Sequence, residues 1–191
     1  MDAKRTHENE LDDSASIKQP REDGDSSVST VRRSKRRQTA QMESMCKAII
    51  KASNEVLEMG YGYSEAVYEK ALMVEIQLTN IGIVLQQVPI TYTYKDHPVG
   101  AGRLDILVTH PHLGDSQIVV ELKLEGIGAV KTINDAIDQV RGYLRSMPPE
   151  SRGIVVVFPK PGKHHCMCVV VAGGTSPPYV SSSTLSSTYS F

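Results

Sequence analysis

Three charged side chains interrupt two apolar segments of strand length: Asp105 in the segment 103–108, and Glu121 and Lys123 in the segment 118–124. The polar residues between the segments include a proline and a glycine, which favours a loop and therefore a β-hairpin. Because side chains alternate along a strand, Glu121 and Lys123 point to the same face. If the two strands pair as antiparallel neighbours, Asp105 lies close to Glu121.

These residue types suit a divalent cation. Carboxylate oxygens are the hard ligands that Mg²⁺ prefers, and Mg²⁺ keeps several water molecules when one or two carboxylates bind it. Asp105 and Glu121 would supply the carboxylates, with the ammonium group of Lys123 beside them. The hairpin therefore predicts a site of the magnesium type next to a lysine.

The composition limits the class of protein to which this hairpin can belong. The chain has 191 residues, 40% of them hydrophobic, and no long apolar run, which is typical of one soluble domain with polar tails. The first thirty residues lack the apolar core of a signal peptide, so we expect neither secretion nor a membrane span. Cys46, Cys166 and Cys168 cannot form a disulfide framework, which indicates a reducing intracellular compartment.

Both ends of the chain are predicted to be disordered. Residues 1–40 are rich in Ser and charged residues and residues 172–191 in Ser and Thr, with too little apolar surface to offset the entropy of ordering. The basic cluster 32–37 suits nuclear import or an electrostatic arm on nucleic acid, and a solvated run without a specific role is an equal alternative. The protein would be nuclear in the first case and otherwise cytoplasmic.

Residues 41–171 are predicted to form the folded domain. They carry 12 Lys and Arg against 14 Asp and Glu, so the domain is slightly acidic and is not by itself a strong attractor of nucleic acid. Hydrophobic periodicity predicts the order α-α-β-β-β-α-β-β, an α/β fold. The expected helices are 41–58, 64–78 and 129–146, and the expected strands are 83–94, 99–108, 117–124, 153–158 and 166–171. The buried stripe expected on the second helix is Val67, Ala71, Val74 and Leu78.

This order carries motifs of a known family. Gly62-x-x-Glu65-x-x-Tyr68, a strand with Gly102-Arg103-x-Asp105 and the tripeptide Glu121-x-Lys123 resemble the GxxExxY proteins, a branch of the PD-(D/E)XK nuclease superfamily. The helix with Gln139-x-x-x-Tyr143 resembles the RecB-like exonucleases of that superfamily. The resemblance covers about residues 45–160 and implies a restriction-endonuclease-like core, a central mixed β-sheet flanked by helices.

The resemblance also implies roles for the residues of the hairpin. Asp105 and Glu121 would bind Mg²⁺ or Mn²⁺, with the backbone carbonyl of Leu122 as a further ligand. Lys123 would position the attacking water or stabilise charge on the phosphate. The alternative for Lys123 is a strand-end lysine that only pairs with Glu121.

Flanking residues would complete this site. Glu65 would be a further metal ligand or accept a hydrogen bond from metal-bound water, unless it only stabilises the helix dipole. Gln139 and Tyr143 share a helical face, where they would hold a nucleic-acid strand or support the catalytic lysine. The alternative for Tyr143 is an aromatic residue at the edge of the core with its hydroxyl in water. Arg103 would contact a phosphate or form a salt bridge with Glu65.

We therefore expect a metal-dependent nuclease that hydrolyses phosphodiester bonds in nucleic acid, with DNA as the expected substrate. The alternative is a catalytically silent module that binds nucleic acid or protein on the same scaffold. An ordinary ion-pair ladder on an α/β domain is a more distant third reading. The pattern leaves the oligomeric state open.

Overall fold

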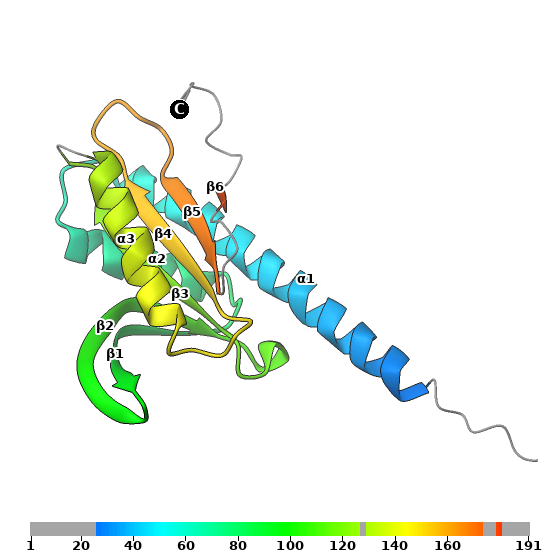
Figure 1. The fold of residues 1–191 in the computed structure, drawn as a ribbon. Coiled ribbons are helices and arrows are strands. Elements are labelled where there is room, and N and C mark those ends of the chain that lie inside the picture. Colours follow the sequence, from blue (N-terminus) through cyan, green and yellow to red (C-terminus); the bar gives the residue numbers. More distant parts are fainter. Residues whose placement is uncertain (1–25, 127–128, 174–178, 181–191) are drawn as a thin grey trace, which may run out of the picture.

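A computed structural model describes residues 26–126, 129–173 and 179–180 of the chain (Figure 1). These residues form an α/β fold in which helices cover both faces of one mixed β-sheet. The predicted element order is confirmed, with one short strand added at the end. No helix in the described part of the chain has both the length and the apolar character needed to cross a membrane.

The six strands lie in the sheet in the order in which they occur in the sequence. All neighbours are antiparallel except the third and fourth strands, which are parallel because helix α3 (Ala129–Leu144) crosses over between them. The strands are β1 (Ile83–Tyr94), β2 (His97–Thr109), β3 (Gln117–Leu124), β4 (Arg152–Phe158), β5 (Met167–Ala172) and β6 (Tyr179–Val180). Strand β3 is thus a central strand with a neighbour on each side.

Helices α1 (Ser26–Glu55) and α2 (Glu65–Leu78), joined by the short 3-10 helix η1 (Val56–Met59), cover one face of the sheet. Their buried residues pack against every second residue of the central strands, among them Val120 and Leu122 of β3. Since strand residues alternate, Glu121 and Lys123 lie on the opposite face, the one that α3 covers.

Helix α3 approaches its face closely because β4 carries a glycine there. A Cβ atom on Gly153 would lie 2.0 Å from Cγ1 of Val140. Such a contact is impossible without a shift of the helix, so Gly153 sets the distance between α3 and the sheet. Val140 and Leu144 then pack against Val155 and its neighbours on β4 and β5.

The buried stripe predicted for α2 is wrong except for Ala71, which is partly buried against the core. The structure buries Tyr68, Leu72 and Ile76, whereas Val67 and Leu78 are 39% and 69% exposed. Both stripes are apolar, so periodicity alone could not choose between them. Tertiary packing makes the choice, because the ring of Tyr68 stacks on Phe158 at the end of β4, with 4.5 Å between the ring centroids.

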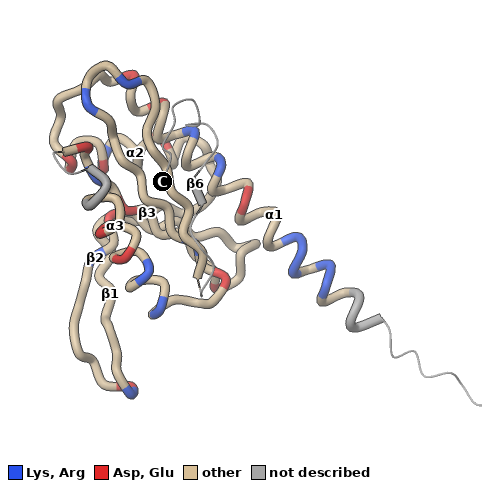
Figure 2. The backbone as a smooth tube through the Cα atoms, turned by 45° about the horizontal axis from the view of Figure 1, so that its top comes forward, with Lys and Arg blue, Asp and Glu red and all other residues tan. Residues whose placement is uncertain are grey.

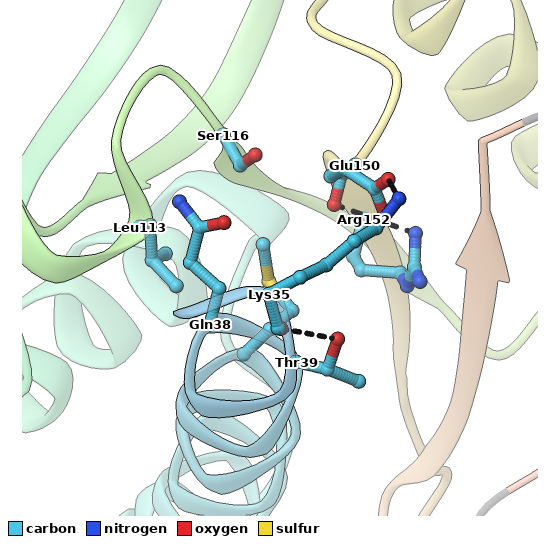
Figure 3. A pocket seen from close by; sticks show the side chains of 8 residues that line it. Lys35, Gln38, Thr39, Leu113, Ser116, Glu150 and Arg152 are labelled. Carbon is cyan, nitrogen blue, oxygen red and sulfur yellow. Dashed lines mark hydrogen bonds and ion pairs between the residues drawn. The ribbon is translucent and has the colours of Figure 1, made fainter. Parts of the chain in front are cut away.

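The first helix also differs from the prediction. Helix α1 begins at Ser26, so residues 26–40 are helical rather than disordered, and the predicted tail 1–25 lies outside the described residues. The extra turns contain Arg, Lys, Gln and Ala, which favour a helix. They also meet the sheet end: Lys35 forms an ion pair with Glu150 at 3.3 Å, beside a small cavity (Figure 3).

The predicted disorder at the other end of the chain is wrong for three described positions. Ala172 still belongs to β5, and Tyr179 and Val180 form β6, which pairs with β5. The backbone pairs of this antiparallel ladder are Val169 with Val180 and Val170 with Tyr179, which composition alone could not predict. Residues 174–178 and 181–191 lie outside the described part.

Candidate active site

The ladder between β2 and β3 ends just before the two acidic residues. The last paired residues are Ile106 and Val120, and Asp105 and Glu121 are the next residues beyond that pair. Here the side chain of Asp105 replaces a backbone acceptor, because its Oδ2 accepts a hydrogen bond from the amide of Leu122 at 2.8 Å. The strands therefore separate at the point where the carboxylates meet.

Glu121 is a buried carboxylate with one unsatisfied oxygen. The residue is 1% exposed, and its Oε1 accepts a hydrogen bond from Nζ of Lys123 at 2.6 Å. Its Oε2 is buried and has no hydrogen-bond partner among the residues that the structure describes. An unpaired buried carboxylate oxygen is costly, which makes this atom a natural point of attachment for a ligand.

Glu65, at the start of α2, contacts the same lysine, Lys123. It is the first residue of α2, its side chain is 44% exposed, and its Oε1 lies 3.8 Å from Nζ of Lys123. The turn before it contains Gly62 at φ 90°, a conformation that favours glycine, and Tyr68 donates a hydrogen bond from its hydroxyl to the carbonyl of Gly60. The motif Gly62-x-x-Glu65-x-x-Tyr68 thus anchors the start of α2 beside the site.

The charges of this cluster perturb one another. Burial, and then the nearby charge of Asp105, raise the pKa of Glu121 to about 7, although Lys123 opposes this rise. Burial also raises the pKa of Asp105, against the hydrogen bond from Leu122. Burial disfavours the ammonium form of Lys123, but the hydrogen bond and charge of Glu121 outweigh it and raise the pKa of Lys123. The lysine is therefore a cation at neutral pH, whereas Glu121 titrates near neutrality.

A fourth acidic residue, Glu69, belongs to this cluster and was not among the residues predicted from the sequence. It is 7% exposed, and its Oε1 accepts hydrogen bonds from Gln86 at 2.9 Å and Gln87 at 2.6 Å. Its charge also acts on Asp105 and raises the pKa of that carboxyl. The available signal was spacing: Glu69 follows Glu65 by four residues, so the two share a helical face.

Tyr143 does not lie where a nucleic-acid contact requires it. The residue is 2% exposed, and its hydroxyl donates a hydrogen bond to the backbone carbonyl of Arg103 at 2.9 Å. The amide of Gln139 donates to the same hydroxyl at 2.5 Å. The burial of Tyr143 against β2 contradicts a hydroxyl in water and leaves almost no surface for a nucleic-acid contact, whereas support of the catalytic lysine stays a prediction. Tyr143 ties α3 to the strand that carries Asp105.

Arg103 and Gln139 lie on the surface around this anchor. Both are exposed, and Arg103 forms no ion pair with Glu65, so the alternative of a salt bridge between them is wrong. The backbone of Arg103 is fixed by Tyr143 while its side chain remains accessible.

The basic cluster 32–37 lies at the other end of the sheet. Helix α1 carries this cluster away from the sheet (Figure 2), and Lys35 meets Glu150, which precedes β4 (Figure 3). The acidic cluster lies near the carboxyl end of β3, level with Val155 and Val157 of β4. About four to five strand residues, or about 15 Å, separate the two ends, so the basic cluster does not border the site.

The acidic side chains of the cluster have the right ligand atoms for a hard cation, but they are not close enough together to bind one as they stand. All the candidate ligands are oxygen atoms, as Mg²⁺ and Mn²⁺ prefer, and Oε2 of Glu121 has no partner within the described part of the chain. Within residues 26–126, 129–173 and 179–180, however, no three His, Cys, Asp or Glu side chains lie close enough together to hold a metal ion. Binding would therefore need side-chain rotation, most readily of the half-exposed Glu65.

A mixed sheet with Glu121-x-Lys123 on its central strand and Asp105 on the neighbouring strand defines a nuclease-like α/β domain. The family model of the PD-(D/E)XK nuclease superfamily matches residues 43–167, and the chain belongs to this superfamily. Neither the comparison with curated proteins nor that with solved structures gives a significant match. The membership confirms the predicted fold class and indicates a nuclease-like function.

Proposed function

We propose that this protein is a metal-dependent nuclease that hydrolyses phosphodiester bonds, with DNA as its substrate. One observation carries the proposal: Asp105, Glu121 and Lys123 converge where β2 and β3 separate, and Oε2 of Glu121 has no partner there among the residues that the structure describes. Membership of the nuclease superfamily supports the same chemistry. The perturbed pKa of Glu121, about 7, is typical of functional carboxylates.

The proposed cofactor is Mg²⁺ or Mn²⁺. Asp105 and Glu121 would hold it, with the carbonyl of Leu122 and the side chain of Glu65 as further ligands. The amide of Leu122 already points to Asp105, and the carbonyl of a strand residue points to the same side as its amide. When bound, the cation would supply Lewis-acid polarisation of a phosphoryl oxygen.

The remaining groups would bind and orient the substrate. Lys123 would hold the attacking water or stabilise charge that develops on the phosphate, because its ammonium group stays protonated beside Glu121 and Glu65. The exposed side chain of Arg103 would contact a backbone phosphate, and exposed Gln139 would bind the strand beside it.

Within the superfamily, we place the chain in the GxxExxY branch, near the RecB-like exonucleases. The support is the arrangement of Gly62, Glu65 and Tyr68 at the start of α2, and the hydrogen bond between Gln139 and Tyr143 on α3. The free, buried cysteines Cys46, Cys166 and Cys168 support an intracellular location. The exposed basic cluster on α1 suits a nuclear import signal.

A silent binding module is the second candidate. It is favoured by the spacing of the acidic side chains, since no three of those in the described part of the chain are placed to hold a metal ion. Such a module would bind nucleic acid or protein without a divalent cation.

A cleavage assay separates the two candidates. Labelled single- and double-stranded DNA and RNA are incubated with the full chain in Mg²⁺, in Mn²⁺ and in EDTA. We expect cleavage of DNA that EDTA abolishes and that Asp105→Ala reduces by about 10³-fold or more, because Asp105 would be a metal ligand. Asp115→Ala, which changes an exposed aspartate in the loop between β2 and β3, is the matched control. Cleavage that survives Asp105→Ala, or none under any condition, would contradict the proposal.

A further inference from the structure

A hydrogen-bonded cluster joins α2 to the edge strand β1 next to the candidate site. Its centre is Glu69, a buried carboxylate whose Oε1 accepts the side-chain amides of two successive residues, Gln86 at 2.9 Å and Gln87 at 2.6 Å. Successive strand residues normally point to opposite faces, so both amides can meet one oxygen only if the strand is distorted there. The cluster therefore marks a local departure from regular β-structure.

The distortion lies at Gln87. Its φ is 54°, in the left-handed region that residues other than glycine, asparagine and aspartate rarely adopt. The β1–β2 ladder is regular on either side, where Gln86 pairs with Ile106 and Val88 with Leu104. Gln87 and Asp105, the residues between these pairs, are not partners. The left-handed residue thus stands across from Asp105.

Asp105 therefore has no backbone partner in β1, whereas its carboxylate forms a hydrogen bond with β3. There it accepts the hydrogen bond from the amide of Leu122 at 2.8 Å. The hydrogen bond from Gln87 to Glu69 and the interrupted ladder at Gln87 connect Glu69 to Asp105.

We propose that Glu69, Gln86 and Gln87 form a positioning unit for Asp105. The two amide hydrogen bonds to Glu69 hold Gln87 in its left-handed conformation, the left-handed residue keeps the ladder open, and the open ladder leaves the carboxylate of Asp105 directed to Leu122. The consequence for metal binding rests on the proposed function. The geometric part does not, because it concerns the protein without any ligand.

Substitutions at Gln87 separate the backbone effect from the side chain. Gln87→Ala removes the amide and places a residue that resists positive φ, so the strand should relax toward a regular ladder. Gln87→Gly removes the same amide but adopts positive φ without strain. Glu69→Ala removes the acceptor of both amides. A role confined to general stability would affect the alanine and glycine variants alike.

Amide hydrogen exchange of the metal-free full chain tests the geometric part. We expect the amide of Leu122 to exchange about tenfold faster in Gln87→Ala and in Glu69→Ala than in the wild type, and within about threefold of the wild type in Gln87→Gly. The amide of Val119, which lies in the regular part of β3, is the internal reference and should not change. Unchanged exchange of Leu122, or equal acceleration at Leu122 and Val119, would overturn the inference.

Calorimetric titration with Mn²⁺ tests whether the positioning unit affects metal binding. The affinity should fall about tenfold in Gln87→Ala and stay within about threefold of the wild type in Gln87→Gly. If the wild type neither cleaves DNA nor binds Mn²⁺, the proposed function fails, while the exchange of Leu122 still decides the positioning unit. If the wild type binds Mn²⁺ and Gln87→Ala binds it equally well, the positioning role for the metal is contradicted.

Discussion

Replacing Lys123 by Met should reduce the rate of DNA cleavage by about 10²–10³-fold at saturating substrate. Lys123 is the cation that contacts both Glu121, at 2.6 Å, and Glu65, at 3.8 Å, so its loss removes the positive charge that lies between these two carboxylates. Methionine keeps most of the length and the apolar stem of lysine, which limits the structural effect. The measurement is the single-turnover rate in Mg²⁺.

Two control variants interpret this result. Lys51→Met removes an exposed lysine that pairs with Glu55 on α1, at 2.7 Å, and should cleave at the wild-type rate. Lys123→Arg keeps a positive charge but changes its geometry, so it should retain only part of the activity. If Lys123→Met cleaves as fast as the wild type, Lys123 is a strand-end lysine with no part in the chemistry.

The stability of the metal-free protein should decrease as the pH rises from about 5 to about 8. The pKa of Glu121 is raised in the folded protein from 4.5 to about 7, so the folded state binds more protons than the unfolded state between these values. A group with a raised pKa contributes stability that is present below its unfolded pKa and lost as the pH rises through its folded pKa. For Glu121 the loss amounts to about 3 kcal/mol, measured as the free energy of unfolding in urea.

Glu121→Gln is the decisive comparison for this pH dependence. Glutamine has nearly the same shape but does not titrate, so the slope between pH 5 and pH 8 should largely disappear in this variant. Burial also raises the pKa of Asp105, so the contribution of Asp105 to the pH dependence has the same sign. If the free energy of unfolding of the wild type rises with pH over this range, the raised pKa of Glu121 is contradicted.

The strands and the charged hairpin could be predicted because their signals are local. The period of two in β3, broken by Glu121 and Lys123, reports which face each side chain takes, and the structure places the two residues together on the α3 face. The third helix was predictable for a similar reason, since its apolar residues recur on one side. Periodicity also predicted the order of the elements, which the structure confirms. The superfamily match confirms the fold class that the family resemblance implied.

Features that depend on tertiary contacts could not be predicted in this way. Helix α2 has apolar residues on two faces, and the stacking of Tyr68 on Phe158 decides which face is buried. Tyr143 is polar and follows a motif, yet its hydroxyl is satisfied by a backbone carbonyl 40 residues away in the sequence. Glu69 is held by residues of a different element, so its burial had no local signal.

The site also explains why an acidic residue is tolerated inside the sheet. Buried charges are costly unless they are paired, and Glu121 is paired on one oxygen by Lys123 and left open on the other. Buried carboxylate oxygens usually have a partner. A cation bound at this oxygen would neutralise the carboxylates and attract the side chain of Glu65. The proposed nuclease function therefore requires that a divalent cation binds between Asp105 and Glu121.

Anomalous X-ray scattering from crystals of the full chain soaked in Mn²⁺ tests this claim most directly. We expect a strong anomalous peak within ligand distance of the carboxylate oxygens of Asp105 and Glu121 and of the carbonyl oxygen of Leu122. Crystals of Asp105→Ala should show no such peak. A map without a peak at this position, at a Mn²⁺ concentration that supports cleavage, would contradict this claim, as would a peak confined to the exposed pair His164 and His165.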